Sequence, residues 1–312
     1  MINRPIKIGT RASKLALWQA HYVADLLKES GMDSEIVLID TKGDQVMEVS
    51  IAKIGSKGVF TQELEEQLLD GRIDIAVHSA KDMPSTLADG LALVAFTQRE
   101  QSHDVLVSRK GNISLSNPNS PLLLGTSSTR RVATLKHFYP HVQTVDVRGN
   151  LQTRIRKMEE GLCDALVLAY AGVYRMGYGE LVIADLGLDE FTPAVGQGSV
   201  AIELATRLDQ SLQQAIIAAC NHPETEVCLR AERAYLRVLE GGCSIPVFAL
   251  AQLRMGILQI NGGIVSLDGK ERIALRVSGP MEQAEQLGEQ LAREVLEAGG
   301  KRILADIKQT PH

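Results

Sequence analysis

The chain has 312 residues, of which 45% are hydrophobic and 23% are charged, a balance typical of a soluble globular protein with room for two or three domains. Its formal net charge of −5 and its aromatic content of 4% argue against a nucleic-acid-binding protein. The lack of any stretch that interleaves basic and aromatic residues argues against it as well. No apolar run has membrane-spanning length, and the first residues lead into a strand pattern rather than a signal peptide.

Cysteine and histidine usage argues against two further kinds of site. The four cysteines form no CxxC pair and no dense framework, which favours a reducing compartment. The seven histidines show no metal-ligand spacing. We therefore expect a cytoplasmic protein without a bound metal and, since no feature indicates association, a monomer.

The first hundred residues alternate between strand and helix patterns. In chain order, we expect strand 5–9, a helix from the capping Ser13 to Gly31, strand 36–39, helix 61–70 and strand 73–77. Parallel βαβ units follow from this spacing. Residues 41–58 contain Gly and Lys with weak periodicity, as expected of a mobile lid.

A second set of βαβ units is expected over about 104–187. Strand 122–124 leads through the turn sequence GTSSTRR into a helix, and strand 145–147 leads through RGNLQTR into helix 151–160. A third strand covers 165–169. Each arginine-bearing sequence thus lies at a strand-to-helix turn.

Positive charge is concentrated in this part of an acidic chain, since residues 125–175 hold eight basic and four acidic residues. Free N–H groups at the two helix starts would face whatever the arginines face. Arginine bonds a carboxylate or phosphate bidentately, so several arginines predict a partner with several anionic groups. The arginines concerned are Arg130, Arg131, Arg148 and Arg154. A solvated helix face is the alternative, and it is what we expect for Arg156 and Lys157.

The pattern changes in the last third of the chain. The sequence PAVGQG at 193–198 breaks the alternation before a strand at 200–204. There follow helix 224–239, short strand patterns at 247–250, 257–260 and 273–277, and a final helix at 281–298. We expect three domains, namely 1–98 with 195–220, then 99–194, and an α+β domain over 221–312. Because ligands of open α/β sheets bind beyond the carboxyl ends of strands, the two α/β domains are expected to face each other across a charged cleft.

Two residues stand out as candidates for chemistry. Asp82 lies at a strand end between Lys81 and the rigid Met83-Pro84 step, where it is either a catalytic carboxylate or a plain turn residue. Cys243 follows two glycines in the loop sequence GGCSIP. It is either an exposed nucleophilic thiol or, as is usual for cysteine, a small buried residue.

Six motifs, taken together and in this order, resemble the porphobilinogen deaminase family, also called hydroxymethylbilane synthases. They are GTRASKLA at 9–16, HSAKDMP at 78–84, GTSSTRR at 125–131, RGNLQTR at 148–154, PAVGQG at 193–198 and GGCSIP at 241–246. The resemblance extends from about residue 5 to residue 250. Thr129 departs from the leucine that family members often have there, but it is not a ligand in this interpretation.

The resemblance implies two periplasmic-binding-protein-like α/β domains facing a cleft, and a smaller α+β domain that carries the cofactor cysteine. It implies a transferase that joins four porphobilinogen molecules head to tail, with loss of ammonia, into the linear tetrapyrrole hydroxymethylbilane of heme and other porphyrin biosynthesis. The implied primer is one dipyrromethane cofactor per chain, held by a thioether to Cys243. Asp82 is the implied catalytic carboxylate, acting on the pyrrole nitrogens of porphobilinogen and of the polypyrrole intermediates.

The resemblance also assigns residues to the acetate and propionate groups. Those implied for the cofactor are Lys81, Ser128, Arg130, Arg131 and Arg148. Those implied for the substrate are Arg11, Ser13, Arg148, Arg154 and Arg175.

Two other classes of protein fit part of the pattern. A solute-binding protein that closes on a carboxylated ligand would explain the paired α/β domains and the arginines, but it needs neither Cys243 nor a tail domain. An enzyme of phosphate esters would use the helix termini, but no Gly-Lys-Ser or Gly-Lys-Thr sequence follows Gly125.

Overall fold

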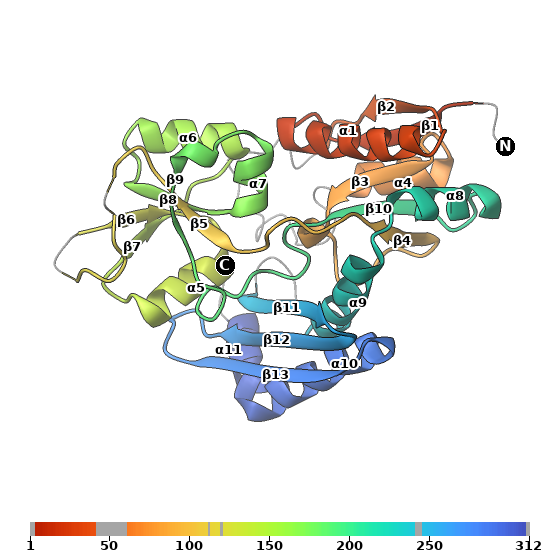
Figure 1. Cartoon of the computed structure of the whole chain (residues 1–312). Coiled ribbons are helices and arrows are strands. Elements are labelled where there is room, and N and C mark those ends of the chain that lie inside the picture. Colours follow the sequence, from red (N-terminus) through yellow and green to blue (C-terminus); the bar gives the residue numbers. More distant parts are fainter. Residues whose placement is uncertain (1–3, 42–60, 112, 119–120, 241–244, 310–312) are drawn as a thin grey trace. The chain divides into compact units, whose positions relative to one another are not determined.

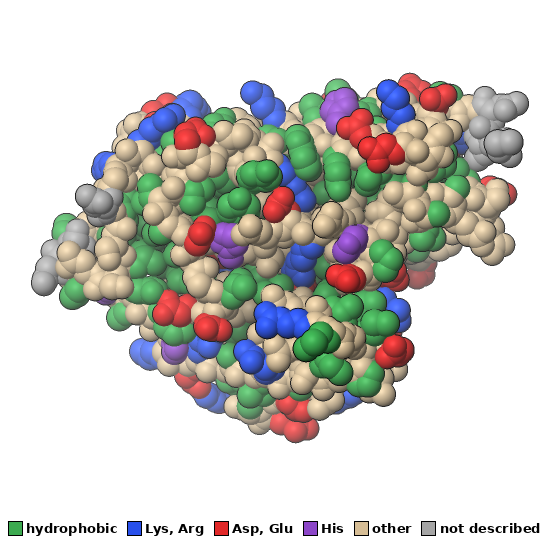
Figure 2. All heavy atoms as spheres, in the orientation of Figure 1, with side chains coloured by type: hydrophobic (Ala, Val, Ile, Leu, Met, Phe, Trp, Pro, Cys, Tyr) green, Lys and Arg blue, Asp and Glu red, His purple; other side chains and the backbone are tan. Residues whose placement is uncertain are grey.

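The computed structural model describes residues 4–41, 61–111, 113–118, 121–240 and 245–309 (Figure 1). The chain divides into two compact units. Unit 1 consists of Met1–Glu100 and Gly198–Glu226, and unit 2 consists of Gln101–Gln197 and Val227–His312. Within the described ranges, no helix combines the length and apolar character that a bilayer crossing demands. Acidic and basic side chains are intermixed over the face shown in Figure 2.

Unit 1 is built on a mixed sheet whose described strands follow the order β2-β1-β3-β10-β4. The strands are β1 (Ile6–Thr10), β2 (Ser34–Leu38), β3 (Ile75–Ser79), β4 (Leu91–Phe96) and β10 (Val200–Ala205). β1 runs parallel to β2 and β3, whereas β10 is antiparallel to β3 and β4. The parallel βαβ arrangement expected from the sequence is therefore confirmed for the first three strands.

Helices cover both faces of this sheet. They are α1 (Lys14–Glu29), α4 (Gln62–Asp70) and α8 (Gln210–Cys220). The Ser13 hydroxyl caps α1 by accepting from the Ala16 N–H at 3.3 Å. Ile75 and Val77 of β3 share a core with α1 and α8, whereas Ala76 between them belongs to a core with α4. This alternation along β3 reflects the two-residue period of a strand.

The first body of unit 2 is a second mixed sheet, whose described strands follow the order β7-β6-β8-β5-β9. The strands are β5 (Asp104–Val107), β6 (Leu123–Gly125), β7 (Gln143–Val145), β8 (Ala165–Ala169) and β9 (Val182–Asp185). β6 runs parallel to β7 and β8, whereas β5 is antiparallel to β8 and β9. Leu166 and Leu168 of β8 pack in one core and Ala165 and Val167 in another.

Three α-helices in the described part of this body follow β6, β7 and β8. They are α5 (Thr129–Phe138), α6 (Leu151–Glu159) and α7 (Tyr170–Arg175). Ser128 caps α5 by accepting from the Arg131 N–H at 3.5 Å, and Asn150 caps α6 by accepting from the Thr153 N–H at 2.9 Å. Both strand-to-helix turns expected from the sequence are thus confirmed.

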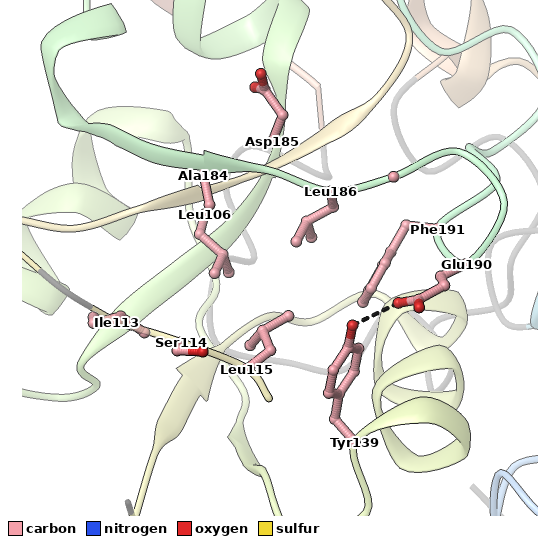
Figure 3. Close-up of a pocket in the computed structure, with 11 residues that line it drawn as sticks. Leu106, Ile113, Ser114, Leu115, Tyr139, Ala184, Asp185, Leu186, Glu190 and Phe191 are labelled. Atoms are coloured by element: carbon pink, nitrogen blue, oxygen red, sulfur yellow. Dashed lines mark hydrogen bonds between the residues drawn. The ribbon is translucent and has the colours of Figure 1, made fainter. Parts of the chain in front are cut away.

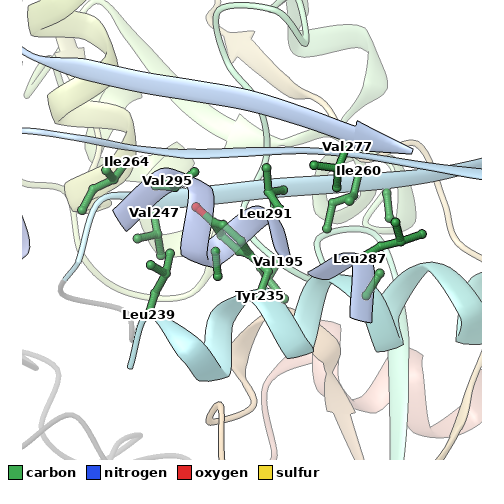
Figure 4. Close-up of a cluster of buried hydrophobic side chains, with 14 of the residues drawn as sticks. Val195, Tyr235, Leu239, Val247, Ile260, Ile264, Val277, Leu287, Leu291 and Val295 are labelled. Carbon is green, nitrogen blue, oxygen red and sulfur yellow. The ribbon is translucent and has the colours of Figure 1, made fainter. Parts of the chain in front are cut away.

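The second body of unit 2 is an antiparallel three-stranded sheet within the described residues, of β11 (Val247–Arg254), β12 (Ile257–Val265) and β13 (Arg272–Pro280). The helices of this body are α9 (Pro223–Val238), of which the part from Val227 belongs to unit 2, α10 (Ala284–Val295) and α11 (Lys301–Gln309). Figure 4 shows Tyr235 among Leu291, Val295 and strand residues in the core between them. The α9 and α10 backbones approach so closely that a Cβ on Gly288 would lie 2.1 Å from the Ala231 carbonyl oxygen.

Several details of the sequence prediction were wrong. The strand expected at 73–77 lies at 75–79. The strand expected at 145–147 lies at 143–145, because β7 pairs only with the three residues of β6. The helix expected at 281–298 is confirmed, as the turn Met281–Gln283, α10 and a further helical turn Leu296–Gly300, and it ends where Gly299 adopts a φ of 114° before α11. Strands β4, β5 and β9 and helices α7, α8 and α11 were not predicted.

Candidate active site

The carboxyl edge of unit 1, where the parallel strands β1 and β3 end, carries four of the predicted site residues. Arg11 follows β1 and Ser13 caps α1, while Lys81 and Asp82 form a single turn of 3₁₀-helix, Ala80–Asp82, after β3. Asp82 is exposed, whereas the next residue, Met83, is only 4% exposed. Burial of Met83 anchors the turn and leaves the Asp82 carboxylate accessible at the edge.

Polar contacts hold the end of β3 from both faces of the sheet. Buried Gln19 of α1 donates through Nε2 to the Ser79 hydroxyl at 2.9 Å. On the side of α4, His78 Nε2 lies 3.0 Å from Glu203 Oε2, and both side chains are buried. The Ala80 N–H donates to the Ser199 carbonyl at 2.9 Å. These contacts fix the strand from which Asp82 projects.

The carboxyl edge of unit 2, where β6, β7 and β8 end, carries the arginine-bearing turns. Ser128 lies at the start of α5, and Arg148 and Arg154 flank the start of α6. Because β5 is antiparallel to β8, Asp104 at the start of β5 lies at this same edge, opposite Ala169. Hydroxyl, amide and guanidinium donors therefore gather where the sequence predicted an anion.

Arg130 and Arg131 are buried side by side on one carboxylate. Arg130 Nη2 lies 2.8 Å from Asp104 Oδ2, and Arg131 Nη2 lies 2.7 Å from Asp104 Oδ1. Their side chains are 5% and 7% exposed, and that of Asp104 is fully buried. Burial by itself would raise the pKa of Asp104, but the two guanidinium charges outweigh it and hold the pKa well below the usual range. The carboxylate is ionised at neutral pH.

The other predicted arginines of unit 2 are less deeply buried. Arg148 is 27% exposed, and its Nε donates to Asp146 Oδ2 at 2.6 Å. Arg154 Nε donates to the Gly149 carbonyl at 2.7 Å, across the turn whose Gly149 has a φ of 115°. Arg175 lies in the last turn of α7. These contacts hold the Arg148 and Arg154 side chains at the turn.

Two of the expected functional elements lie outside the described residues. They are Cys243, for which covalent attachment was predicted, and all but Thr41 of the expected lid at 41–58. The other three cysteines, Cys163, Cys220 and Cys228, are buried. Burial raises the pKa of the Cys220 thiol to about 12, so this thiol does not compete as a nucleophile.

Sequence reasoning missed Asp104 and Gln197. The Gln197 side chain is buried and its Nε2 donates to Asp104 Oδ1 at 2.8 Å. A signal was present for both: Asp104 opens the otherwise apolar strand Asp-Val-Leu-Val, and Gln197 belongs to the motif PAVGQG. A lone carboxylate at the start of a fully buried strand requires a partner, and an arginine was the obvious one.

A small cavity in unit 2 lies apart from these residues (Figure 3). Its volume is about 250 Å³, and it is lined mainly by apolar side chains of β5, β9 and the segments near them. Tyr139 donates to Glu190 at its rim at 2.6 Å. None of the predicted site residues lines it. In the parts of the chain that are described, no group of three or more His, Cys, Asp or Glu side chains is arranged to hold a metal ion.

Arginines, hydroxyls and helix N-termini at the carboxyl edges of two α/β sheets are typical of an anion-binding protein. Comparison with known proteins makes this class specific. Residues 6–214 match the family model "Porphobilinogen deaminase, dipyromethane cofactor binding domain", and residues 226–297 match "Porphobilinogen deaminase, C-terminal domain". The chain belongs to the porphobilinogen deaminase family.

Relatives of nearly the same length support this membership. The porphobilinogen deaminase of Desulfosudis oleivorans is 56% identical, over 97% of this chain and 98% of that protein. The porphobilinogen deaminase of Cytophaga hutchinsonii is 54% identical, over 99% of this chain and 98% of that protein. The resemblance inferred from six motifs, with the transferase class and the dipyrromethane cofactor that it implied, is confirmed.

Solved structures of other proteins are similar in part. The VFT2 domain of BvgS from Bordetella pertussis is 15% identical and covers 69% of this chain and 85% of that chain, with a TM-score of 0.43. The methionine-binding protein MetQ is also 15% identical and covers 69% and 89% of the two chains, with a TM-score of 0.42. The expected fold class, two α/β sheets with a smaller α+β body, is confirmed by the sheets themselves.

Proposed function

We propose that this chain joins four porphobilinogen molecules head to tail, with release of ammonia, into hydroxymethylbilane. The observation that supports this most directly is full-length identity of 56% to a porphobilinogen deaminase. The carboxyl edges of both units add the chemistry required, because porphobilinogen carries an acetate and a propionate group on its pyrrole ring. Cationic and hydroxyl donors at these edges match such a substrate.

Asp82 is the residue that we propose for catalysis. Loss of ammonia from porphobilinogen, and attack by the next pyrrole carbon, both develop positive charge on a ring nitrogen. A carboxylate about 4 Å from such a charge, in an effective dielectric of about 20, contributes roughly 4 kcal/mol, or about a thousandfold in rate, if it favours the transition state. Asp82 is exposed on a turn that is held by the buried Met83 and by the hydrogen bond from the Ala80 N–H to the Ser199 carbonyl, as this role requires.

We propose that Arg11 and Ser13 of unit 1, and Arg148, Arg154 and Arg175 of unit 2, bind the carboxylates of the substrate. Arg11 and Ser13 lie at the edge that also carries Asp82, so a carboxylate held there would place a ring near the catalytic group. Correct placement of reacting groups supplies a large share of enzymatic rate. These residues therefore orient the substrate rather than activate it.

The residues present fit a dipyrromethane cofactor, which when bound supplies the covalent primer for the reaction. Its carboxylates require cationic partners, and two buried Nε–H groups, of Arg130 and Arg131, have no acceptor among the residues that the structure describes. We propose Lys81, Ser128 and Arg148 as further partners of its acidic groups and Cys243 as its attachment point. Ser128 contributes a hydroxyl at the start of α5.

We further propose that the protein acts in the cytoplasm as a monomer. The division into domains 1–98 with 195–220, 99–194 and 221–312 remains our interpretation of the sequence pattern. The last of these domains would carry Cys243 at its loop.

Incubation of the purified protein with porphobilinogen tests the function. We expect release of four ammonia molecules per hydroxymethylbilane formed. Ultraviolet absorption and chromatography detect the product. A solute-binding protein would return porphobilinogen unchanged. That result would refute the proposal.

A further inference from the structure

Asp104 is the centre of a buried polar cluster in unit 2 that the sequence did not reveal. Its Oδ2 accepts from Arg130 at 2.8 Å, and its Oδ1 accepts from Arg131 at 2.7 Å and from Gln197 at 2.8 Å. The Asp104 side chain is fully buried. Oδ2 is held from α5, and Oδ1 is held both from α5 and from Gln197, so the carboxylate cannot rotate without breaking a charged hydrogen bond.

Each arginine is also fixed at its second terminal nitrogen. Arg130 Nη1 donates to the Thr192 carbonyl at 3.0 Å, and Arg131 Nη1 donates to the Val167 carbonyl of β8 at 2.9 Å. Each guanidinium group is therefore oriented by two hydrogen bonds, one at each terminal nitrogen. A guanidinium carries five N–H donors, of which these contacts occupy two in each arginine.

The charges of the cluster do not cancel. Two guanidinium groups share one carboxylate, so the cluster keeps one net positive charge beneath the N-terminus of α5, whose dipole has the same sign. Burial lowers the pKa of Arg130, while Asp104 opposes that shift and Arg131 adds to it. Without Asp104, two buried guanidinium groups would repel each other with no counter-charge, and both would be driven toward solvent.

Gln197 connects the cluster to the two chain crossings between the units. Its Nε2 donates to the Ser102 carbonyl at 2.7 Å as well as to Asp104. Ser102 lies just after the point where the chain enters unit 2, and Gln197 is the last residue before the chain returns to unit 1. The side chain is 1% exposed. Gln197 thus links Asp104 to the segment at Ser102, where the chain has just entered unit 2.

We propose that Asp104 is a positioning residue for cofactor binding, which holds Arg130 and Arg131 in the orientation that presents one net positive charge to an acidic group of the cofactor. It touches neither substrate nor reacting atoms and acts through the two arginines. The proposal rests on the proposed function, in which these arginines bind the cofactor. In this role, Asp104 orients the two buried arginines for binding of the cofactor.

The test compares Asp104→Asn with Asp74→Asn. Asp74 is the matched control, because it is 5% exposed and accepts from Arg4 at 2.6 and 2.7 Å, but it belongs to unit 1 and contacts neither Arg130 nor Arg131. Both variants and the wild type are prepared as apo-protein and are then incubated with porphobilinogen. Intact mass gives the fraction that carries dipyrromethane, and thermal unfolding of both forms gives the stabilisation by the cofactor.

We expect Asp104→Asn to lower the fraction of cofactor-loaded protein about tenfold under limiting porphobilinogen, because both arginines lose their counter-charge and one of them loses its acceptor. The rise in Tm from apo- to holo-protein should also be smaller than in the wild type. Asp74→Asn should lose Tm in both forms yet keep wild-type loading and the wild-type rise. A purely structural role for Asp104 would lower the Tm of both forms equally and leave the rise unchanged.

Besides an unchanged rise in Tm, three results would overturn the proposal. The first is wild-type loading in Asp104→Asn, and the second is an equal loss of loading in Asp74→Asn. The third is a larger apo-to-holo rise in Asp104→Asn, which would mean that Asp104 competes with the cofactor for the arginines. Wild-type protein that gains no mass would instead refute the proposed function itself, and the proposal with it.

A second variant keeps the proposal testable if Asp104→Asn does not fold. Gln197→Met retains the length of the side chain and the ion pairs but removes one donor to Asp104 Oδ1. We expect a smaller loss of loading in the same direction. Unchanged loading in this variant would overturn the proposal.

Discussion

The two α/β sheets have the same topology but use their carboxylates differently. In each, three parallel strands are followed by an antiparallel strand and then an edge strand, in the orders β2-β1-β3-β10-β4 and β7-β6-β8-β5-β9. The carboxyl edge of unit 1 carries Asp82, exposed on a turn. The carboxyl edge of unit 2 carries Asp104, fully buried between Arg130 and Arg131.

The two carboxylates lie at the carboxyl edges of similarly ordered sheets, Asp82 after β3 and Asp104 at the start of β5, and they differ in burial. An exposed carboxylate can approach a substrate and respond to charge that develops there. A buried carboxylate must be paired, and its charge is neutralised by its cationic partners. On this account unit 1 supplies the catalytic charge and unit 2 supplies cations for the acidic groups, with Asp104 as their counter-ion.

The largest effect is expected at the exposed carboxylate. Asp82→Asn keeps size and shape but removes the charge, so single-turnover rates on holo-protein should fall by a factor of about 10² to 10⁴. The fold and the cofactor should be retained, and Asp82→Glu should retain more activity than Asn. A wild-type rate in Asp82→Asn would show that Asp82 is a plain turn residue and that unit 1 does not supply the catalytic charge through it.

A smaller effect is expected at the less buried cations of unit 2. Arg148→Leu or Arg154→Leu should impair cofactor assembly and raise KM by about 10- to 100-fold, because each removes a charged hydrogen-bond donor from the edge. Steady-state kinetics and intact mass measure the two effects. Normal cofactor with an unchanged KM in both variants would reduce these arginines to surface charges.

The buried carboxylate of unit 2 has a defined signature in the pH dependence of stability. The pKa of Asp104 is lowered in the folded chain, so its contribution is complete above the unfolded value of about 3.9 and is lost as pH falls toward the folded value. The difference in unfolding free energy between wild type and Asp104→Asn should be constant from pH 5 to 8 and shrink below about pH 4. Urea unfolding across this range measures it, and a difference that changed between pH 6 and 8 would implicate another group.

The smallest effect is expected outside both edges. Arg156 is 63% exposed and pairs with Glu160 one helical turn away, as the sequence predicted for a solvated helix face. Arg156→Gln should change stability by less than about 0.5 kcal/mol and leave KM unchanged. It is the control for Arg154→Leu on the same helix, and a KM effect of similar size in both would show that general charge, rather than position, accounts for binding.

Much of the fold and part of the site could be predicted because local signals agreed with tertiary structure. Ser13 and Ser128 were recognisable as helix caps, and β8 was found with its bounds because its apolar run is buried on both faces. Lys81 and Asp82 were placed at a strand end for the same reason. These features depend on contacts a few residues apart in the chain.

The parts that could not be predicted depend on distant contacts. The sequence suggested that Arg130 and Arg131 face a ligand directly, but it did not show that both are buried on Asp104, 26 and 27 residues away. Nor did it show that Gln197, 93 residues from Asp104, completes the cluster. The antiparallel direction of β5 brings Asp104 to the arginine edge, and strand direction is set by the whole sheet rather than by any local pattern.

The central claim is that this chain carries its own dipyrromethane on Cys243, and intact-mass spectrometry tests it most directly. The account predicts that wild-type protein is heavier than its sequence by two linked pyrroles, and that Cys243→Ala has the mass of its sequence and no activity, because a methyl group cannot form the thioether. Circular dichroism of Cys243→Ala confirms that it is folded. Wild-type protein at the mass of its sequence, or the same added mass on Cys243→Ala, would contradict the account.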